Sequence, residues 1–199
     1  MSSSIQARTL GADWPPSVRV RTSSMESPFV KALASAQIGA TYNQYADSPL
    51  RRQRLADYLG GRRRASIVLV GEAAGYNGAR VSGIAFTSER QLTGAGPAEL
   101  SATIVHRTLA ELGIAEDVLL WNLVPTHPHR AGVPSSNRRP TAAEIAAGLP
   151  FVERVAEGRR VLAVGRLAER ALGAPYVRHP SHGGAAEFRA TLAAWRSLI

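Results

Sequence analysis

The sequence contains no cysteine, a single lysine (Lys31) and no long apolar run. Without cysteine the chain can form no disulfide bond, no thiolate zinc site and no cysteine-held iron–sulfur cluster. No apolar run approaches the length that crosses a membrane, and the first residues lack the hydrophobic segment of a secretory signal. We therefore expect a cytoplasmic protein without membrane contact, and no part of the sequence requires a cofactor or a metal ion.

The 199 residues carry a formal net charge of +9, nearly all of it from arginine. A basic chain fits a nucleic-acid partner, because basic side chains make the phosphate contacts. Charge alone does not decide this, since an arginine-rich composition also arises from the base composition of a genome. Hydrophobic residues make up 45% of the chain, enough for one core. We expect a loose arm over residues 1–25 and a single domain over residues 26–199, present as a monomer.

Short apolar runs alternate with helical patterns along the chain. Strands are expected at 67–70, 118–121, 160–164 and 176–178. Helices are expected at 28–36, 49–60, about 97–112, 141–155, 166–172 and from about 185 to the end. Strands that alternate with helices predict a parallel sheet covered on both faces. The predicted fold is a three-layer α/β/α sandwich around a central four-stranded, mainly parallel sheet.

Polar residues follow three of the expected strands. Glu72 comes after Gly71 at the end of the first strand, Asn122 ends the second and His179 follows the fourth. The ends of parallel strands meet at one edge of a sheet, and ligands bind in the crevice beyond that edge. A carboxylate can position water, an amide can read the edge of a base, and an imidazole can stabilise a developing negative charge. With Phe86 as a stacking surface, these residues indicate a nucleobase pocket.

Five motifs resemble, in the same order, those of the uracil-DNA glycosylase superfamily. GEAAG at 71–75 is similar to the GEAPG of its iron–sulfur branch, and GIAF at 83–86 resembles the segment whose phenylalanine stacks on the base. WNLVP at 121–125 resembles the segment with the base-reading asparagine. NRRPT..EI at 137–145 is similar to NRKPT..EI of that branch, and HPS at 179–181 is similar to the second catalytic motif.

The resemblance implies a monofunctional DNA glycosylase. Such an enzyme hydrolyses the N-glycosidic bond of a deaminated base flipped out of DNA and leaves an abasic site. Uracil is the first expected base, and hypoxanthine and xanthine are alternatives. The implied catalytic residues are Glu72, His179 and Asn77, with either Glu72 or Asn77 positioning the water. The implied base-binding residues are Ala73, Ala74, Phe86 and Asn122. The implied DNA-binding residues are Arg138, Arg139, Ser181, His182 and Gly183.

The chain departs from the family pattern in its first motif. Ala74 stands where the family usually has proline. Ala73 occupies the position at which another branch carries an aspartate, and its methyl group cannot activate water. The cysteines of the iron–sulfur branch are absent, and the loop from Gly75 to Gly83 differs from the acidic loop of that branch. The choice of base therefore stays open.

A metal-dependent hydrolase is one alternative. His127 and His129 are two residues apart, and His179 and His182 would complete a zinc site. Pro128 and the many turn residues around it do not favour a strand there.

Two further alternatives rest on the first motif. A nucleotide-binding module would use Gly71, Gly75 and Gly78, but their spacing matches neither common phosphate-binding motif. A catalytically silent binder of DNA lesions would keep the pocket without activating water, which fits Ala73.

Overall fold

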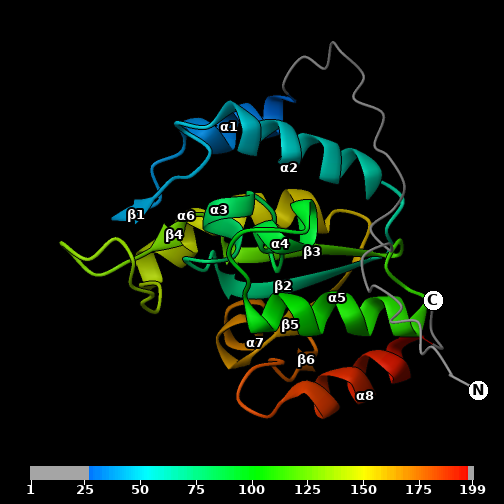
Figure 1. Ribbon diagram of the computed structural model, residues 1–199. Coiled ribbons are helices and arrows are strands. Elements are labelled where there is room, and N and C mark those ends of the chain that lie inside the picture. The colour runs from blue at the N-terminus through cyan, green and yellow to red at the C-terminus, as the bar shows by residue number, and fades with distance from the viewer. Residues whose placement is uncertain (1–26, 197–199) are drawn as a thin grey trace, which may run out of the picture.

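A four-stranded parallel sheet forms the centre of the molecule, as the sequence predicts, and its strand order is β3-β2-β5-β6 (Figure 1). The computed structural model describes residues 27–196, so the expected arm over 1–25 lies outside the described residues. The strands are β2 (Ile67–Ala73), β3 (Val118–Val124), β5 (Arg160–Val164) and β6 (Tyr176–Val177). No helix within residues 27–196 is long and apolar enough to span a membrane.

Two pairs of helices cover the two faces of this sheet. Helices α5 (Leu100–Leu112) and α8 (Ala185–Arg196) lie side by side on one face, and α6 (Ala142–Ala156) and α7 (Arg166–Leu172) pack on the other (Figure 1). The residues of β2 from Ile67 to Val70 are consequently buried on both faces. This double burial explains why the strand reads as a continuous apolar run. The predicted three-layer arrangement is confirmed.

Three helices start at residues whose side chains cap them. The Ser27 hydroxyl accepts a hydrogen bond from the Val30 amide at the start of α1 (Pro28–Ser35). The Ser48 hydroxyl accepts one from the Arg51 amide at the start of α2 (Pro49–Gly61). At the start of α6 the Thr141 hydroxyl and the Glu144 carboxylate form a capping box. Each such cap stabilises its helix by about 1 kcal/mol.

Helices α1 and α2 shield the outer edge of β3. The Tyr58 hydroxyl of α2 accepts a hydrogen bond of 2.7 Å from the Leu120 amide, which no neighbouring strand can reach. Phe29 of α1 packs on Trp121, with 5.7 Å between the ring centroids, and on Phe151 of α6. The contact through Phe29 shows that the Trp121 side chain lies on the α6 face of the sheet. The exposed strand edge, a site of unwanted pairing, is thus covered.

Two strands are longer than their apolar runs. The expected ends at residues 70 and 121 are wrong by three residues, because β2 continues to Ala73 and β3 to Val124. The reason is their mutual pairing, which runs through Gly71 opposite Asn122 and Ala73 opposite Val124. The backbone stays extended wherever the partner strand satisfies it, whatever the polarity of the side chains.

Four further segments, which we expected to be loops, have regular structure. Helices α3 (Ala79–Ser82) and α4 (Glu89–Thr93) lie between β2 and α5. Strand β1 (Thr41–Tyr42) pairs antiparallel with β4 (His127–Pro128), although the sequence argues against a strand at Pro128. A hydrogen bond of 2.6 Å between the hydroxyls of Thr41 and Thr126 joins the same two segments.

Candidate functional site

Gly71 and Asn122 lie opposite each other in β2 and β3, and the Phe86 ring packs against Gly71 on one face of the sheet. A Cβ atom added to Gly71 would collide with the ring of Phe86 and would lie 2.9 Å from Oδ1 of Asn122. Only glycine leaves room there for both groups. An aromatic face and a side-chain amide therefore meet above Gly71, at the carboxyl ends of the strands.

A network of polar groups holds Phe86 in an unusual conformation. The φ angle of Phe86 is 50°, in the left-handed region that a bulky residue rarely adopts. The Ser82 hydroxyl donates to the Thr87 carbonyl oxygen at 2.6 Å, and the Thr87 hydroxyl bonds Nε2 of His106 at 2.9 Å. Burial lowers the pKa of His106, on α5, to about 4, so this imidazole is neutral at pH 7. Backbone strain of this kind concentrates at functional sites.

His179 lies beside Phe86, with 6.4 Å between the ring centroids. The Ser181 amide donates a hydrogen bond of 3.2 Å to Nδ1 of His179, so Nδ1 is an acceptor and the proton of the neutral ring is on Nε2. Burial, followed by the charges of His182 and Arg178, lowers the pKa of His179. The ring is therefore a neutral imidazole at pH 7 with an N–H group to donate.

The loop after His179 is tightly folded. A Cβ atom at Gly184 would collide with the carbonyl oxygen of His179, so the chain can turn back here only with glycine. His182 has a φ of 52° and Gly183 a φ of 78°. The Ser181 hydroxyl lies 2.9 Å from Nδ1 of His182. His182 and Gly183 are exposed beside the site.

Glu72 does not join Phe86, Asn122 and His179. Successive side chains of a strand point to opposite faces of the sheet, so Glu72 points away from the face on which the Gly71 and Asn122 side-chain positions lie. Burial raises the pKa of Glu72, and the charges of Arg139 and of Arg170 on α7 lower it. The expected grouping of an acid, an amide and an imidazole is therefore corrected, because the strand continues past Val70.

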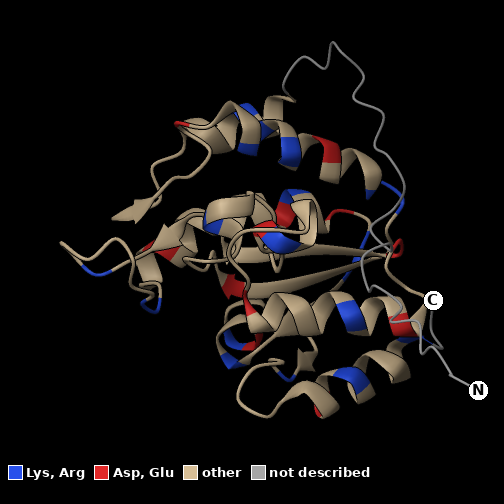
Figure 2. Cartoon of the chain, in the orientation of Figure 1, with Lys and Arg blue, Asp and Glu red and all other residues tan. Residues whose placement is uncertain are grey.

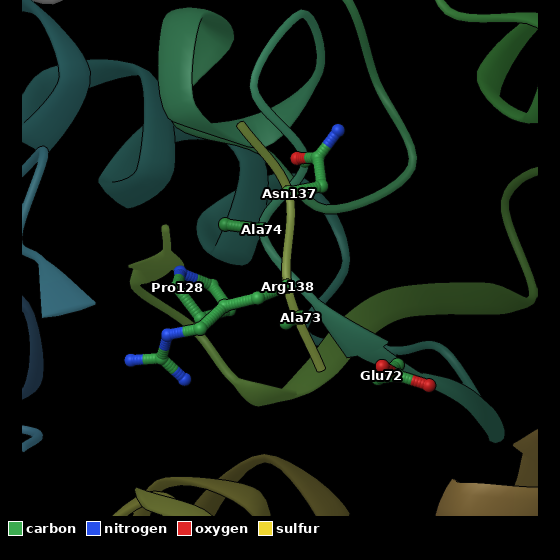
Figure 3. Close-up of a pocket in the computed structure, with 7 residues that line it drawn as sticks. Glu72, Ala73, Ala74, Pro128, Asn137 and Arg138 are labelled. Atoms are coloured by element: carbon green, nitrogen blue, oxygen red, sulfur yellow. The ribbon is translucent and has the colours of Figure 1, made fainter. Parts of the chain in front are cut away.

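A small hollow lies at the end of β2 around Glu72. It has a volume of about 120 Å³ and is lined by Glu72, Ala73, Ala74, Gly75, Pro128, Asn137 and Arg138. Figure 3 shows that the Glu72 carboxylate and the Arg138 guanidinium point in opposite directions from it. The Asn137 side chain closes the hollow by accepting a hydrogen bond of 2.9 Å from the Tyr76 amide.

The residues after Glu72 are placed differently from one another. Ala73 lies on the same face as Gly71, opposite Val124. The Ala74 amide donates to the Val124 carbonyl oxygen, and the Ala74 carbonyl oxygen lies 2.8 Å from Nδ1 of His127. Both main-chain groups of Ala74 are thus used within the protein, which leaves Ala73 as the candidate base contact of this pair. Asn77 is exposed in a turn.

The two arginines of the long loop after β4 have different surroundings. The Arg138 guanidinium makes two hydrogen bonds, of 2.8 and 2.6 Å, to the buried Glu144 carboxylate, and its Nε donates to the His129 carbonyl oxygen. Arg138 is the main reason that the pKa of Glu144 falls to about 2. Arg139 is exposed. Arg138 therefore fixes the loop to α6, and Arg139 remains as the candidate DNA contact of the two.

A row of stacked side chains near the first motif was not expected from the sequence. The Arg80 guanidinium lies 4.5 Å from the ring centre of Tyr76 and 5.2 Å from that of Tyr42. The Tyr76 ring lies 5.9 Å from His127, and His127 stacks on His129 at 5.8 Å. The residues come from three distant segments, so no local spacing in the sequence reveals the row.

The histidines proposed for a zinc site are not gathered. The two ring nitrogens of His127 lie 2.8 and 3.3 Å from the main-chain oxygens of Ala74 and Pro134. The His129 ring stacks on the His127 ring, whereas His179 and His182 belong to the loop after β6. Within residues 27–196 no group of three or more histidine and acidic residues is arranged to hold a metal ion.

Comparisons with known proteins agree with this geometry. The family model of the uracil DNA glycosylase superfamily matches residues 59–198. The crystal structure of wild-type SMUG2 from Pedobacter heparinus has a similar fold, with a TM-score of 0.64 and 13% sequence identity. The superposition covers 85% of this chain and 97% of that one. No curated protein matches the sequence.

Proposed function

The chain belongs to the uracil DNA glycosylase superfamily, and we propose on that premise that it excises a deaminated base from DNA. The proposed reaction hydrolyses the N-glycosidic bond of a nucleotide flipped out of DNA and leaves an abasic site. Uracil is the proposed base, and hypoxanthine and xanthine are the alternatives. The observation that carries the proposal is that the Phe86 ring and the Asn122 amide meet over Gly71, with the His179 ring beside Phe86.

In the proposed reaction each of these residues has a separate role. The flipped base stacks on Phe86, and the Asn122 amide, which has both donors and an acceptor, pairs with its edge. The main-chain amide of Ala73 is a further contact, because the pairing of β2 with β5 ends before it, at Val70 opposite Ala163. The site therefore recognises a flat ring whose edge forms hydrogen bonds.

His179 assists the departure of the base. When the N-glycosidic bond breaks, its electron pair goes to the base and the sugar becomes cationic. The Nε2–H group of the neutral His179 ring donates to the carbonyl oxygen on which the negative charge of the base accumulates. The Ser181 amide holds the ring in this tautomer through its bond to Nδ1.

DNA is held at the same edge of the sheet. Ser181, His182 and Gly183 offer main-chain and side-chain groups beside the pocket, and Arg139 adds a positive charge that faces solvent. Figure 2 shows further basic residues on the loop between β4 and α6. These groups fit phosphate contacts, which fix the register of the DNA without reading its sequence.

The decisive experiment measures base release without metal. Purified protein is incubated in EDTA with single- and double-stranded oligonucleotides that contain one uracil, hypoxanthine or xanthine, and alkali then cleaves the abasic sites. We expect cleavage at uracil and none at a thymine in the same position. Asn122→Ala and His179→Ala should each slow the reaction by about 10²-fold or more. Failure of the wild-type protein to release any of the three bases would refute the proposal.

A catalytically silent lesion binder is a second candidate, supported by one observation. Ala73 is the first-motif residue on the pocket face next to Gly71, and it carries no carboxylate. A silent binder would retard a uracil-containing oligonucleotide in a gel and yield no cleavage after alkali. A carboxylate from another part of the chain removes this objection.

A further inference from the structure

Glu99 places a carboxylate at the loop that follows the first motif. It lies at the start of α5, at the capping position before Leu100. A Cβ atom on either Gly75 or Gly78 would collide with the Glu99 carboxylate. The two glycines, on a loop more than twenty positions earlier in the chain, therefore leave room for this carboxylate.

The carboxylate has no partner that explains its position. Thr103 donates two hydrogen bonds to the main-chain carbonyl oxygen of Glu99. Within residues 27–196 no group makes a hydrogen bond or an ion pair with the Glu99 carboxylate, and the side chain is partly buried. Burial raises the pKa of the carboxyl group. Removing an ionisable group from water without a partner costs free energy, so a role in packing alone does not account for Glu99.

Glu99 lies on the pocket face of the sheet. His106 follows it by seven residues in the chain, about two turns of helix, so both occupy the same side of α5. His106 contacts Thr87, the neighbour of Phe86, whose ring lies over Gly71. From His106 to Glu99 the helix advances by about 10 Å, toward the loop at the carboxyl end of β2.

The other candidates for positioning water are less suitably placed. Glu72 points to the opposite face of the sheet and interacts with Arg139 and Arg170. Asn77 is exposed in the turn that surrounds Glu99, and Ala73 has only a methyl group. Glu99 is thus the carboxylate that the fold brings to the pocket side of the first motif.

We propose that Glu99 is the catalytic carboxylate that positions and deprotonates the attacking water. The inference rests on the proposed glycosylase activity. As the N-glycosidic bond breaks and the base takes its electron pair, the Glu99 carboxylate stabilises the cationic sugar. The water oxygen then forms a bond to the anomeric carbon and gives its proton to Glu99, which passes it to solvent or to the released base.

The test compares three substitutions by single-turnover cleavage of uracil-containing DNA. Glu99→Gln keeps the shape of the side chain and removes the base, so we expect a rate at least about 10²-fold lower. Binding to an uncleavable uracil analogue in DNA should be unchanged. Glu72→Gln should retain most of the wild-type rate. Glu153→Gln, an exposed residue of α6, is the matched control with no expected effect.

Two readouts separate a chemical role from a structural one. The wild-type rate should rise with pH as Glu99 loses its proton, and the Glu99→Gln rate should lack this rise. Sodium formate should accelerate Glu99→Ala and have no effect on the wild type, because the small carboxylate enters the vacated space.

The outcomes distinguish the two proposals. Wild-type activity with a fully active Glu99→Gln protein would overturn the role of Glu99 and leave the glycosylase function in place. The role of Glu99 would also be overturned if Glu99→Gln lost both activity and thermal stability and formate did not restore the activity of Glu99→Ala. A wild-type protein that releases no base would overturn both.

Discussion

Gly71 lies directly opposite Asn122 across two parallel strands, and the Phe86 ring occupies the space that any side chain on Gly71 would need. This relationship makes one backbone position responsible for the shape of the pocket. The amide and the ring come from different parts of the chain, but both are placed against the same glycine. The residue type at position 71 is therefore fixed by the packing of Phe86 and Asn122 and not by a turn.

Gly71→Ala should displace the Phe86 ring. A methyl group would collide with the ring, and a displacement of about 1 Å in the positioning of a substrate costs about 10²-fold in rate. Overpacking should also lower the free energy of unfolding by about 1–3 kcal/mol. Single-turnover cleavage and chemical denaturation measure the two effects.

A matched glycine in α2 supplies the control. A Cβ atom on Gly60 meets nothing within 4 Å. Gly60→Ala should stabilise the helix by about 0.5–1 kcal/mol and leave the rate unchanged. Equal rates for Gly71→Ala and the wild type would show that the base does not bind against Phe86.

Arg138 and Arg139 should respond oppositely to substitution by alanine. Arg138→Ala leaves the buried Glu144 carboxylate unpaired, so we expect the free energy of unfolding to fall by about 3–5 kcal/mol. Arg139→Ala should leave the melting temperature unchanged and weaken DNA binding, with the slope of log affinity against log salt reduced by about 1. Denaturation curves and salt titrations of DNA binding measure these changes.

The acid dependence of stability provides a second test of the same pair. Arg138 lowers the pKa of Glu144 from its ordinary value of 4.5 to about 2 in the folded state. The stabilisation is therefore complete above pH 4.5 and is lost as the pH falls toward 2. The difference in stability between the wild type and Arg138→Ala should shrink across that range. If the difference in stability stayed constant over this range, the Glu144 carboxyl group would not be the group that takes up the proton.

The sequence predicts the four strands and the polar residues at their ends because both follow from local patterns. Apolar runs and the Thr141–Glu144 capping box locate the strands and helix α6, and the polar residues at strand ends locate Asn122 and His179. The face on which Glu72 lies could not be predicted. It depends on whether the strand stops at Val70 or continues, and pairing with β3, not side-chain polarity, decides this.

Other features of the site depend on contacts between distant segments. The Glu99 carboxylate fits where it does only because Gly75 and Gly78 have no side chains. The stacked row of Tyr76 and His127 joins the first motif to β4. Such contacts leave no periodic pattern in the sequence, because the residue type at each position depends on a distant residue and not on its neighbours in the chain. These contacts can be identified only in the folded structure.

His106 should make the protein less stable in mild acid. Its pKa is 6.5 in the unfolded chain and about 4 in the folded one, so the unfolded state binds more protons between these values. Stability therefore rises with pH between about 4 and 6.5, by about 3 kcal/mol in total, and levels off above that range. His106→Gln should remove this part of the pH dependence in denaturation experiments, whereas an identical pH dependence in the variant would contradict the buried, neutral ring.

His179→Ala should lose activity in proportion to how poorly the base leaves. The Nε2–H group stabilises negative charge on the departing base, and removal of one such donor costs about 10²–10³-fold in rate. A base whose anion is already stable needs this donor less. We therefore expect a much smaller loss with 5-fluorouracil than with uracil in the same oligonucleotide, measured by single-turnover cleavage of each substrate. If the loss were equal for the two bases, His179 would act on binding or loop structure and not on the leaving group.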